Sequence, residues 1–241
     1  MKNTVLEKRG TVALLTMNYK QENRLHPDFV EELLLRLDEV EHDDEMRALV
    51  VTGGDSKYFC NGLDLEWFAA NRDRLGLAVT ECMTRVNRLY GRLTVFPKPT
   101  VAAINGHVFA GGVFLACTMD FRFMREERGW VCLPEVDIKI PLLPGMMAIT
   151  QAVVTPQGFR ELYFTGRRFT AKEAQAIGFA DRVVPGENLI AEALDFAATL
   201  AAKPTPVYAE MKRRLRSPIV EIFERVDPDY FAQALTFALQ G

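Results

Sequence analysis

The sequence predicts an α/β fold built around one substantial core. Short apolar stretches alternate along the chain with longer segments in which apolar residues recur every three or four positions, as strands and amphipathic helices do. The length of 241 residues, with 49% hydrophobic and 25% charged residues, suits one such domain with a small helical appendage.

The first elements follow from local pattern and turn residues. Residues 5–8 and 12–17 are apolar stretches separated by Arg9-Gly10-Thr11, which predicts a hairpin or two early strands. Pro27 begins a helix whose apolar residues share one face. Residues 47–52 then form a short buried strand that ends at Gly53-Gly54. Strand, helix and strand in this order predict a right-handed parallel crossover.

The rest of the chain continues this alternation and then becomes helical. We expect helices around residues 65–68 and 76–96, and strands at 101–104, 121–124 and 131–133. Helices predominate from Gly145 onward, and Thr170 with Glu173 forms a capping box. Residues 183–184 add one short strand. The tail from residue 189 is predicted as amphipathic helices broken at Pro204, Pro206, Pro218 and Pro228. We therefore assign residues 1–188 to a core and 189–241 to a C-terminal helical region.

Composition excludes several classes of protein. The net charge of −3 argues against a nucleic-acid binder. No apolar run is long enough for a membrane span, and no signal-peptide pattern opens the chain. The four cysteines form no CxxC pair and do not cluster with the three histidines, so we expect no metal site and a reducing, cytoplasmic setting. Cys60, beside Asn61-Gly62, is expected to line a pocket.

Two segments about twenty residues apart carry the chemistry. Residues 106–116 include Gly111-Gly112 at the expected start of a helix, where bare backbone N–H groups can hold a developing negative charge. Glu135 follows an apolar, strand-like stretch. The glycine segment contains no acid. Together the segments predict an oxyanion hole with a single general base, although the glycine pair alone could serve only close helix packing.

Five patterns then occur in a fixed order. They are residues 50–53, residues 59–65 (Phe-Cys-Asn-Gly-Leu-Asp-Leu), residues 99–107 with Gly111-Gly112 and Asp120, residues 134–136 (Pro-Glu-Val), and residues 162–184. In this order and spacing the chain resembles the crotonase (enoyl-CoA hydratase/isomerase) superfamily over nearly its whole length. The resemblance implies a spiral of ββα units around two roughly perpendicular sheets. It also implies a C-terminal helical trimerisation region, and hence a homotrimer or a dimer of trimers.

The resemblance also implies an acyl-CoA thioester substrate, with coenzyme A as part of the substrate and no tightly bound cofactor. The thioester oxygen would lie between the N–H groups of Leu63 and Gly111, and Glu135 would be the base. Crotonase hydratases carry a second glutamate at the position that Phe114 occupies here. One base suffices for a 1,3 proton shift, so the resemblance favours the Δ3,Δ2-enoyl-CoA isomerase branch, which residues 23–28 and 135–138 also resemble.

Substrate contacts are expected, by the same resemblance, at Arg24, Leu25, Cys60 and Gly62, with Phe114 making one side of the pocket apolar. Arg24 could meet a CoA phosphate or remain a solvated loop charge. The cluster at residues 212–214 (Lys-Arg-Arg) could reach a neighbouring subunit's CoA, or form a solvated helix face.

Other residues and reactions stay open. Asp137 would share a face with Glu135 if the segment is extended, but a turn or capping role is favoured. Asp64 is expected to favour a helix N-terminus, and His107 to be structural rather than catalytic. The alternative functions are hydration, thioester hydrolysis or decarboxylation of an acyl-CoA, and a non-catalytic CoA-binding homologue.

Overall fold

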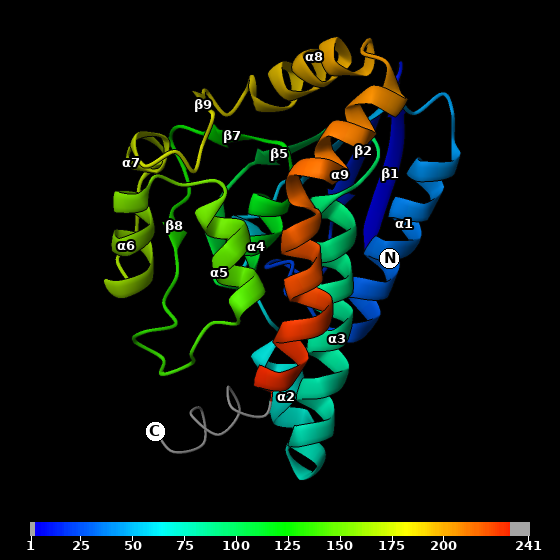
Figure 1. Ribbon diagram of the computed structural model, residues 1–241. Helices are drawn as coiled ribbons and strands as arrows, with labels where there is room; N and C mark the ends of the chain where they lie inside the picture. Colours follow the sequence, from blue (N-terminus) through cyan, green and yellow to red (C-terminus); the bar gives the residue numbers. More distant parts are fainter. Residues whose placement is uncertain (1–2, 232–241) are drawn as a thin grey trace.

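Two β-sheets organise the computed structural model, which describes residues 3–231 (Figure 1). The larger sheet has the spatial order β1-β2-β3-β5-β7-β9; β1 and β2 pair as an antiparallel hairpin, and the other neighbours are parallel. Its strands are β1 (Thr4–Arg9), β2 (Val12–Met17), β3 (Ala48–Thr52), β5 (Thr100–Ile104), β7 (Phe121–Arg125) and β9 (Arg182–Val184).

The smaller sheet has three short strands in the order β4-β6-β8, all parallel. They are β4 (Tyr58–Cys60), β6 (His107–Phe109) and β8 (Val131–Cys132). Strands β4 and β6 were not predicted, because three-residue strands among polar and glycine-rich segments show little periodicity. The helix start expected at Gly111-Gly112 is confirmed, since α4 begins at Gly111.

Nine α-helices occur between residues 3 and 231. They are α1 (Pro27–His42), α2 (Leu65–Ala70), α3 (Leu75–Thr94), α4 (Gly111–Thr118), α5 (Pro144–Gln151), α6 (Pro156–Phe164), α7 (Ala171–Ala176), α8 (Leu189–Ala201) and α9 (Thr205–Glu221). A π-helical turn (Ile222–Val226) and a 3₁₀ turn (Asp227–Tyr230) follow α9. The predicted capping box starts α7, where Thr170 and Glu173 cap each other's backbone.

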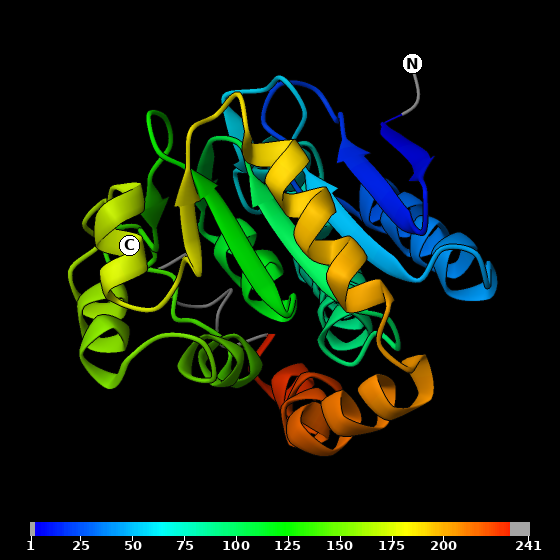
Figure 2. The ribbon, with the colours of Figure 1, turned by 90° about the horizontal axis from the view of Figure 1, so that it is seen from above.

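The helices cover both faces of the larger sheet, because side chains alternate along each strand. Leu15 and Val51 point into the main core, which α1 and α3 share, whereas Leu14 and Val50 pack against α8. Figure 2 shows α8 lying across its face of the sheet. Ala193, with the other small residues of α8, lets that helix approach closely. This arrangement confirms the α/β fold; the division at residue 188 stays a prediction.

One expectation about the tail is wrong. Helix α9 continues through Pro218, and Pro206 lies in its first turn, where a missing N–H costs nothing. Pro218 lies three residues before the end of α9, and a π-helical turn follows directly. Pro218 removes one backbone hydrogen bond, because it has no N–H to donate to the carbonyl of Arg214, and α9 persists because it packs against α3 (Figure 1).

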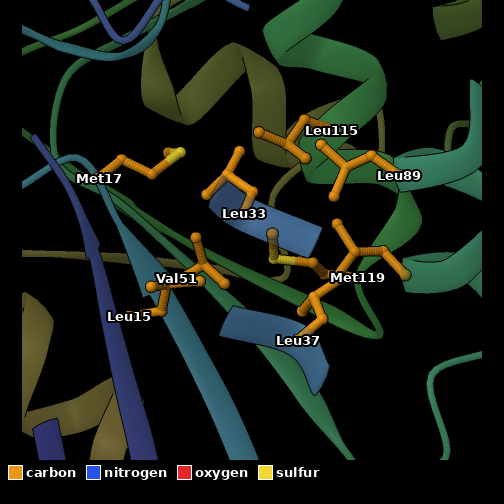
Figure 3. Close-up of a pocket in the computed structure, with 9 residues that line it drawn as sticks. Leu15, Met17, Leu33, Leu37, Val51, Leu89, Leu115 and Met119 are labelled. Carbon is orange, nitrogen blue, oxygen red and sulfur yellow. The ribbon is translucent and has the colours of Figure 1, made fainter. Parts of the chain in front are cut away.

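The main core contains a small cavity of about 10 Å³ (Figure 3). Only apolar side chains line it, among them Met17, Leu33, Leu89 and Met119. A void of this size holds at most one water, and an apolar lining gives that water no partner. The cavity is therefore a packing defect and not a substrate pocket.

Candidate active site

The three strands of the smaller sheet lead to the three predicted catalytic residues at one edge of the sheet. Parallel strands end on the same side of a sheet. The chain leaves β4 toward Leu63, leaves β6 toward Gly111 and leaves β8 toward Glu135. Residues from three distant stretches of sequence therefore meet where the carboxyl ends of the strands converge.

The backbone of Leu63 is oriented by a bridge to Leu25. The N–H of Leu25 donates to the carbonyl of Gly62 (2.7 Å), and the N–H of Asp64 donates to the carbonyl of Leu25 (2.9 Å). In such a parallel bridge the N–H of Leu63 itself points away from Leu25. It donates to no partner among residues 3–231. Leu25 was expected to contact the substrate, but its side chain is fully buried. In the structure it acts through its backbone, which orients Leu63.

The N–H of Gly111 is also unpaired within the described chain, because Gly111 is the first residue of α4 and no side chain caps that helix. Ala110 precedes it with φ of 49° and ψ of −124°, a conformation rarely adopted by residues with side chains. A Cβ on Gly111 would lie 3.3 Å from the Cα of Gly62. The two candidate oxyanion donors therefore lie on adjoining backbone segments.

Gly112 allows close helix packing, which was the alternative interpretation of the glycine pair. A Cβ there would lie 2.3 Å from the carbonyl oxygen of Cys60, which is a backbone collision. The absent side chain lets α4 lie directly on β4. The close packing thus belongs to Gly112, whereas Gly111 carries the unpaired N–H that is the candidate donor.

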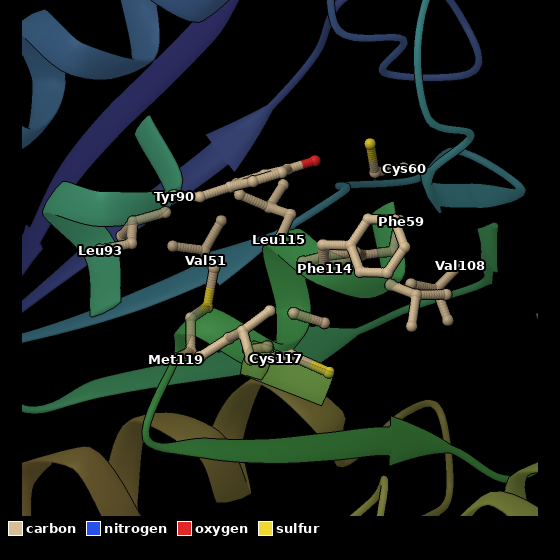
Figure 4. Packing of buried hydrophobic residues seen from close by; sticks show 14 of the residues in the cluster. Val51, Phe59, Cys60, Tyr90, Leu93, Val108, Phe114, Leu115, Cys117 and Met119 are labelled. Atoms are coloured by element: carbon tan, nitrogen blue, oxygen red, sulfur yellow. The ribbon is translucent and has the colours of Figure 1, made fainter. Parts of the chain in front are cut away.

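Cys60 does not line a pocket. Its thiol is fully buried and donates to the carbonyl of Asn23 (3.1 Å), and burial raises its pKa to about 12. The expected substrate contact therefore has no exposed surface through which it could form. Figure 4 shows the thiol among the buried side chains around Tyr90 and Phe114.

Glu135 has the environment that a general base needs. Glu135 is only 7% exposed, and its Oε2 atom has no hydrogen-bond partner in the described structure. Burial raises the pKa of its carboxyl from 4.5 to about 7, and a backbone N–H of Glu135 itself opposes part of that rise. Such a carboxyl can both take and return a proton near neutral pH.

Phe114 lies within the apolar core, where it is 1% exposed and packs edge-on against Tyr90 with ring centroids 6.5 Å apart (Figure 4). It brings no acid to this part of α4, but with so little exposed surface it does not form the open, apolar pocket wall that was expected of it. The Tyr90 hydroxyl donates to the carbonyl of Gly111 (2.7 Å). No motif in the sequence marks Tyr90, because its partners come from distant segments.

Asp137 does not share a face with Glu135, because residues 135–139 form turns rather than a strand. The N–H groups of Asp137 and Ile138 both donate to the carbonyl of Pro134.

Asp64 is the N-cap of α2 and accepts from the backbone N–H groups of Glu66 and Trp67, as expected. His107 accepts a hydrogen bond from the N–H of Trp130 (3.2 Å), which agrees with a structural role.

A polar surface cavity of about 280 Å³ lies beside the Leu25–Leu63 bridge. Tyr19, Lys20, Arg24 and Glu66 contribute to its wall. Arg24 pairs with Glu22 and lies 3.8 Å from Glu66, so its charge is largely neutralised within the chain. Lys20, which the sequence analysis did not single out, is 59% exposed and lies 3.6 Å from Asp64.

The basic cluster at residues 212–214 is divided between the interior and the surface of the protein. Lys212 is buried against Asp120 (2.6 Å) and the carbonyl of Lys98 (2.8 Å), so it cannot reach a neighbouring subunit's CoA. Arg213 and Arg214 pair with Glu210 on the surface of α9.

Within residues 3–231 no group of three His, Cys, Asp or Glu side chains is arranged to hold a metal ion, and no helix is long and apolar enough to cross a membrane.

Comparison with known proteins assigns the family. The enoyl-CoA hydratase/isomerase family profile matches residues 7–226. Enoyl-CoA delta isomerase 3 of Arabidopsis thaliana is 32% identical over 215 residues, covering 87% of this chain and 90% of the relative. The short-chain-enoyl-CoA hydratase of Clostridium acetobutylicum is 29% identical over 220 residues, covering 89% and 80%. Human mitochondrial delta3-delta2-enoyl-CoA isomerase superposes with a TM-score of 0.88 at 25% identity, covering 99% and 92% of the two chains. The chain belongs to the enoyl-CoA hydratase/isomerase family.

Proposed function

We propose that this protein is a Δ3,Δ2-enoyl-CoA isomerase. The observation that carries the proposal is a buried carboxyl with an unpartnered oxygen, Glu135, at a strand edge that also presents two backbone N–H groups with no partner among residues 3–231. The other buried carboxyl beside this edge, that of Asp64, is engaged as the N-cap of α2. Where hydratases of the family carry a second acid, this chain has the buried ring of Phe114. The arrangement suits a reaction in which one group takes a proton and returns it elsewhere on the same substrate.

In the proposed reaction the Glu135 carboxylate removes a proton from C2 of a 3-enoyl-CoA. The electrons of the broken C–H bond delocalise into the thioester, and the N–H groups of Leu63 and Gly111 stabilise the resulting oxyanion. The neutral Glu135 carboxyl then protonates C4, which leaves the double bond between C2 and C3. Each fixed donor contributes about 3–4 kcal/mol to stabilising the transition state.

Hydration is the principal alternative, since several similar proteins are named enoyl-CoA hydratases. Adding water across a double bond is served by two carboxyl groups, which position and activate the water and deliver its proton. Asp137 is the nearest acid in sequence, but it lies in an exposed turn. Neither Phe114 nor Asp137 therefore supplies a buried second carboxyl.

The proposal extends to assembly and setting. Val207, Met211 and Leu215 recur every fourth residue on α9 and are 58%, 68% and 75% exposed. Such an apolar stripe on a surface helix favours burial against another copy of the chain, and we propose a homotrimer or a dimer of trimers. The four cysteines are free and buried, which suits a cytoplasmic, reducing compartment. Coenzyme A enters as part of the substrate, without a tightly bound cofactor.

The test compares Glu135→Gln with Asp137→Asn, which removes one carboxylate from the same loop at an exposed position. Turnover of 3-hexenoyl-CoA is followed by chromatography, and binding of a saturated acyl-CoA by calorimetry. Glu135→Gln is expected to abolish turnover and retain binding, while Asp137→Asn keeps both. Retained turnover in Glu135→Gln would remove Glu135 from the role of base.

A further inference from the structure

The first turn of α4 has few means of holding its position. Gly111 and Gly112 have no side chains to pack, the preceding Ala110 is strained, and no side chain caps the helix. The N–H of Gly111 must nevertheless keep a fixed direction if it is to stabilise an oxyanion. Preorganised donors are effective because they need no rearrangement during the reaction.

One buried side chain contacts this turn from a different helix. Tyr90 of α3 is fully buried, and its hydroxyl donates to the carbonyl of Gly111 at 2.7 Å. A Cβ on Gly111 would lie 3.1 Å from the same hydroxyl oxygen, so the phenol fills the space that a side chain would take. In Figure 4 the Tyr90 ring extends over Leu115.

Tyr90 is itself held in place. Its ring packs edge-on against Phe114 (6.5 Å, 66°) and at a tilt against Phe223 (5.9 Å, 55°), which follows α9. Burial keeps its pKa well above the ordinary value, and the charge of Glu135 contributes to this rise after the cysteines nearby. The hydroxyl therefore remains a proton donor over the working pH range.

We propose that Tyr90 is a positioning residue, which fixes the Gly111 N–H in the oxyanion site through its hydrogen bond to the Gly111 carbonyl and by filling the space beside Gly111 where a side chain would lie. The inference rests on the proposed acyl-CoA chemistry, because it concerns the donor that holds the thioester oxygen. It also gives Phe114 a second task, which is to support the ring of Tyr90.

Tyr90→Phe tests this inference, because it removes the hydroxyl and keeps the ring. The matched control is Tyr163→Phe: Tyr163 is also buried and donates to a backbone carbonyl, that of Met146 (3.0 Å), but does not contact α4's first turn through that bond. Two readouts are needed: kcat and KM for 3-hexenoyl-CoA, and the infrared C=O stretch of bound hexanoyl-CoA labelled with ¹³C at the thioester carbon. A bound thioester shifts to lower frequency when the oxyanion donors polarise it.

We expect Tyr90→Phe to lower kcat about 10-fold to 100-fold with little change in KM, as misplaced catalytic groups do. It should also lose about half or more of the C=O shift, whereas Tyr163→Phe keeps the shift and loses less than about threefold in kcat. A merely structural role would reduce the thermal stability of both variants and leave the carbonyl frequency unchanged.

An unchanged C=O frequency in Tyr90→Phe, with kcat within about threefold of wild type, overturns the inference. If Tyr90→Phe does not fold, 3-fluorotyrosine at position 90 provides a stronger donor of nearly the same shape, and an unmoved C=O frequency then overturns it. Failure of the isomerase proposal is a separate outcome: a wild-type protein that polarises the thioester without moving the double bond leaves the role of Tyr90 intact. A wild-type protein that shows no C=O shift overturns the oxyanion site and the inference together.

Discussion

Replacing Glu135, the proposed general base, is expected to stabilise this protein in alkaline solution. The Glu135 carboxyl is neutral in both folded and unfolded chains at low pH. As the pH rises above 4.5 the unfolded chain ionises first, because the pKa of Glu135 in the folded chain is about 7. Folding stability that is fully present below pH 4.5 is therefore lost progressively until about pH 7, and the loss is constant above that.

The size of the effect follows from the two pKa values. One pH unit corresponds to about 1.4 kcal/mol, so the separation between 4.5 and about 7 costs about 3 kcal/mol at pH 8 and about 1 kcal/mol at pH 5. Glu135→Gln keeps the shape of the side chain and removes the charge. For a chain of 241 residues, 3 kcal/mol corresponds to a rise in Tm of about 6–12 °C.

The assay is thermal unfolding of wild type, Glu135→Gln and Asp137→Asn at pH 5 and pH 8, followed by circular dichroism at fixed protein concentration. We expect the Tm advantage of Glu135→Gln to be at least twice as large at pH 8 as at pH 5, and Asp137→Asn to show no such growth. An advantage that is the same at both pH values, or absent at pH 8, would refute the idea that Glu135 ionises at a cost in a desolvated site.

Further predictions concern the same site and the surface of α9. The kcat/KM for 3-hexenoyl-CoA should fall at acid pH with a midpoint near pH 7, because only the ionised Glu135 accepts a proton; a flat profile between pH 5.5 and 8.5 would speak against this base. Phe114→Glu, checked for folding by circular dichroism, should acquire measurable hydration of crotonyl-CoA, and no gain would mean that a second acid is insufficient. Gly112→Ala should lower stability by about 1–3 kcal/mol, measured by urea unfolding, because its Cβ meets the Cys60 carbonyl; an unaffected midpoint would show that α4 can move away from β4. Met211→Glu should shift the light-scattering mass from trimer toward monomer, and an unaltered mass would exclude this stripe from the interface.

Most of the fold was predictable because its longer elements carry strong local signals. The apolar face of α1, the buried strand β3 and the capping box of α7 each lie in a contiguous stretch that needs no tertiary information. The strands β4 and β6 were missed because each is three residues long, and pairing with neighbouring strands defines them. The continuation of α9 through Pro218 was missed for a similar reason, since the packing of α9 against α3 joins segments that are far apart in the sequence.

Candidate backbone donors and a candidate base could be proposed from the sequence, whereas the side chains that surround them could not. Gly111 and Glu135 stand out by motif, but the burial of Cys60 and Lys212 depends on partners far away in the sequence. Tyr90 illustrates the same limit, since its contact with Gly111 joins α3 to α4. Sequence pattern identifies residues that lie in short contiguous motifs, such as Gly111 and Glu135. It does not identify the side chains that hold them.

The central claim is that this site moves a double bond and does not add water. The most direct measurement gives the wild-type protein 3-hexenoyl-CoA and crotonyl-CoA in parallel and resolves the products by mass. We predict that 3-hexenoyl-CoA becomes 2-hexenoyl-CoA without a change in mass, while crotonyl-CoA gains no water. Hydration of crotonyl-CoA at a rate comparable to isomerisation would contradict the account.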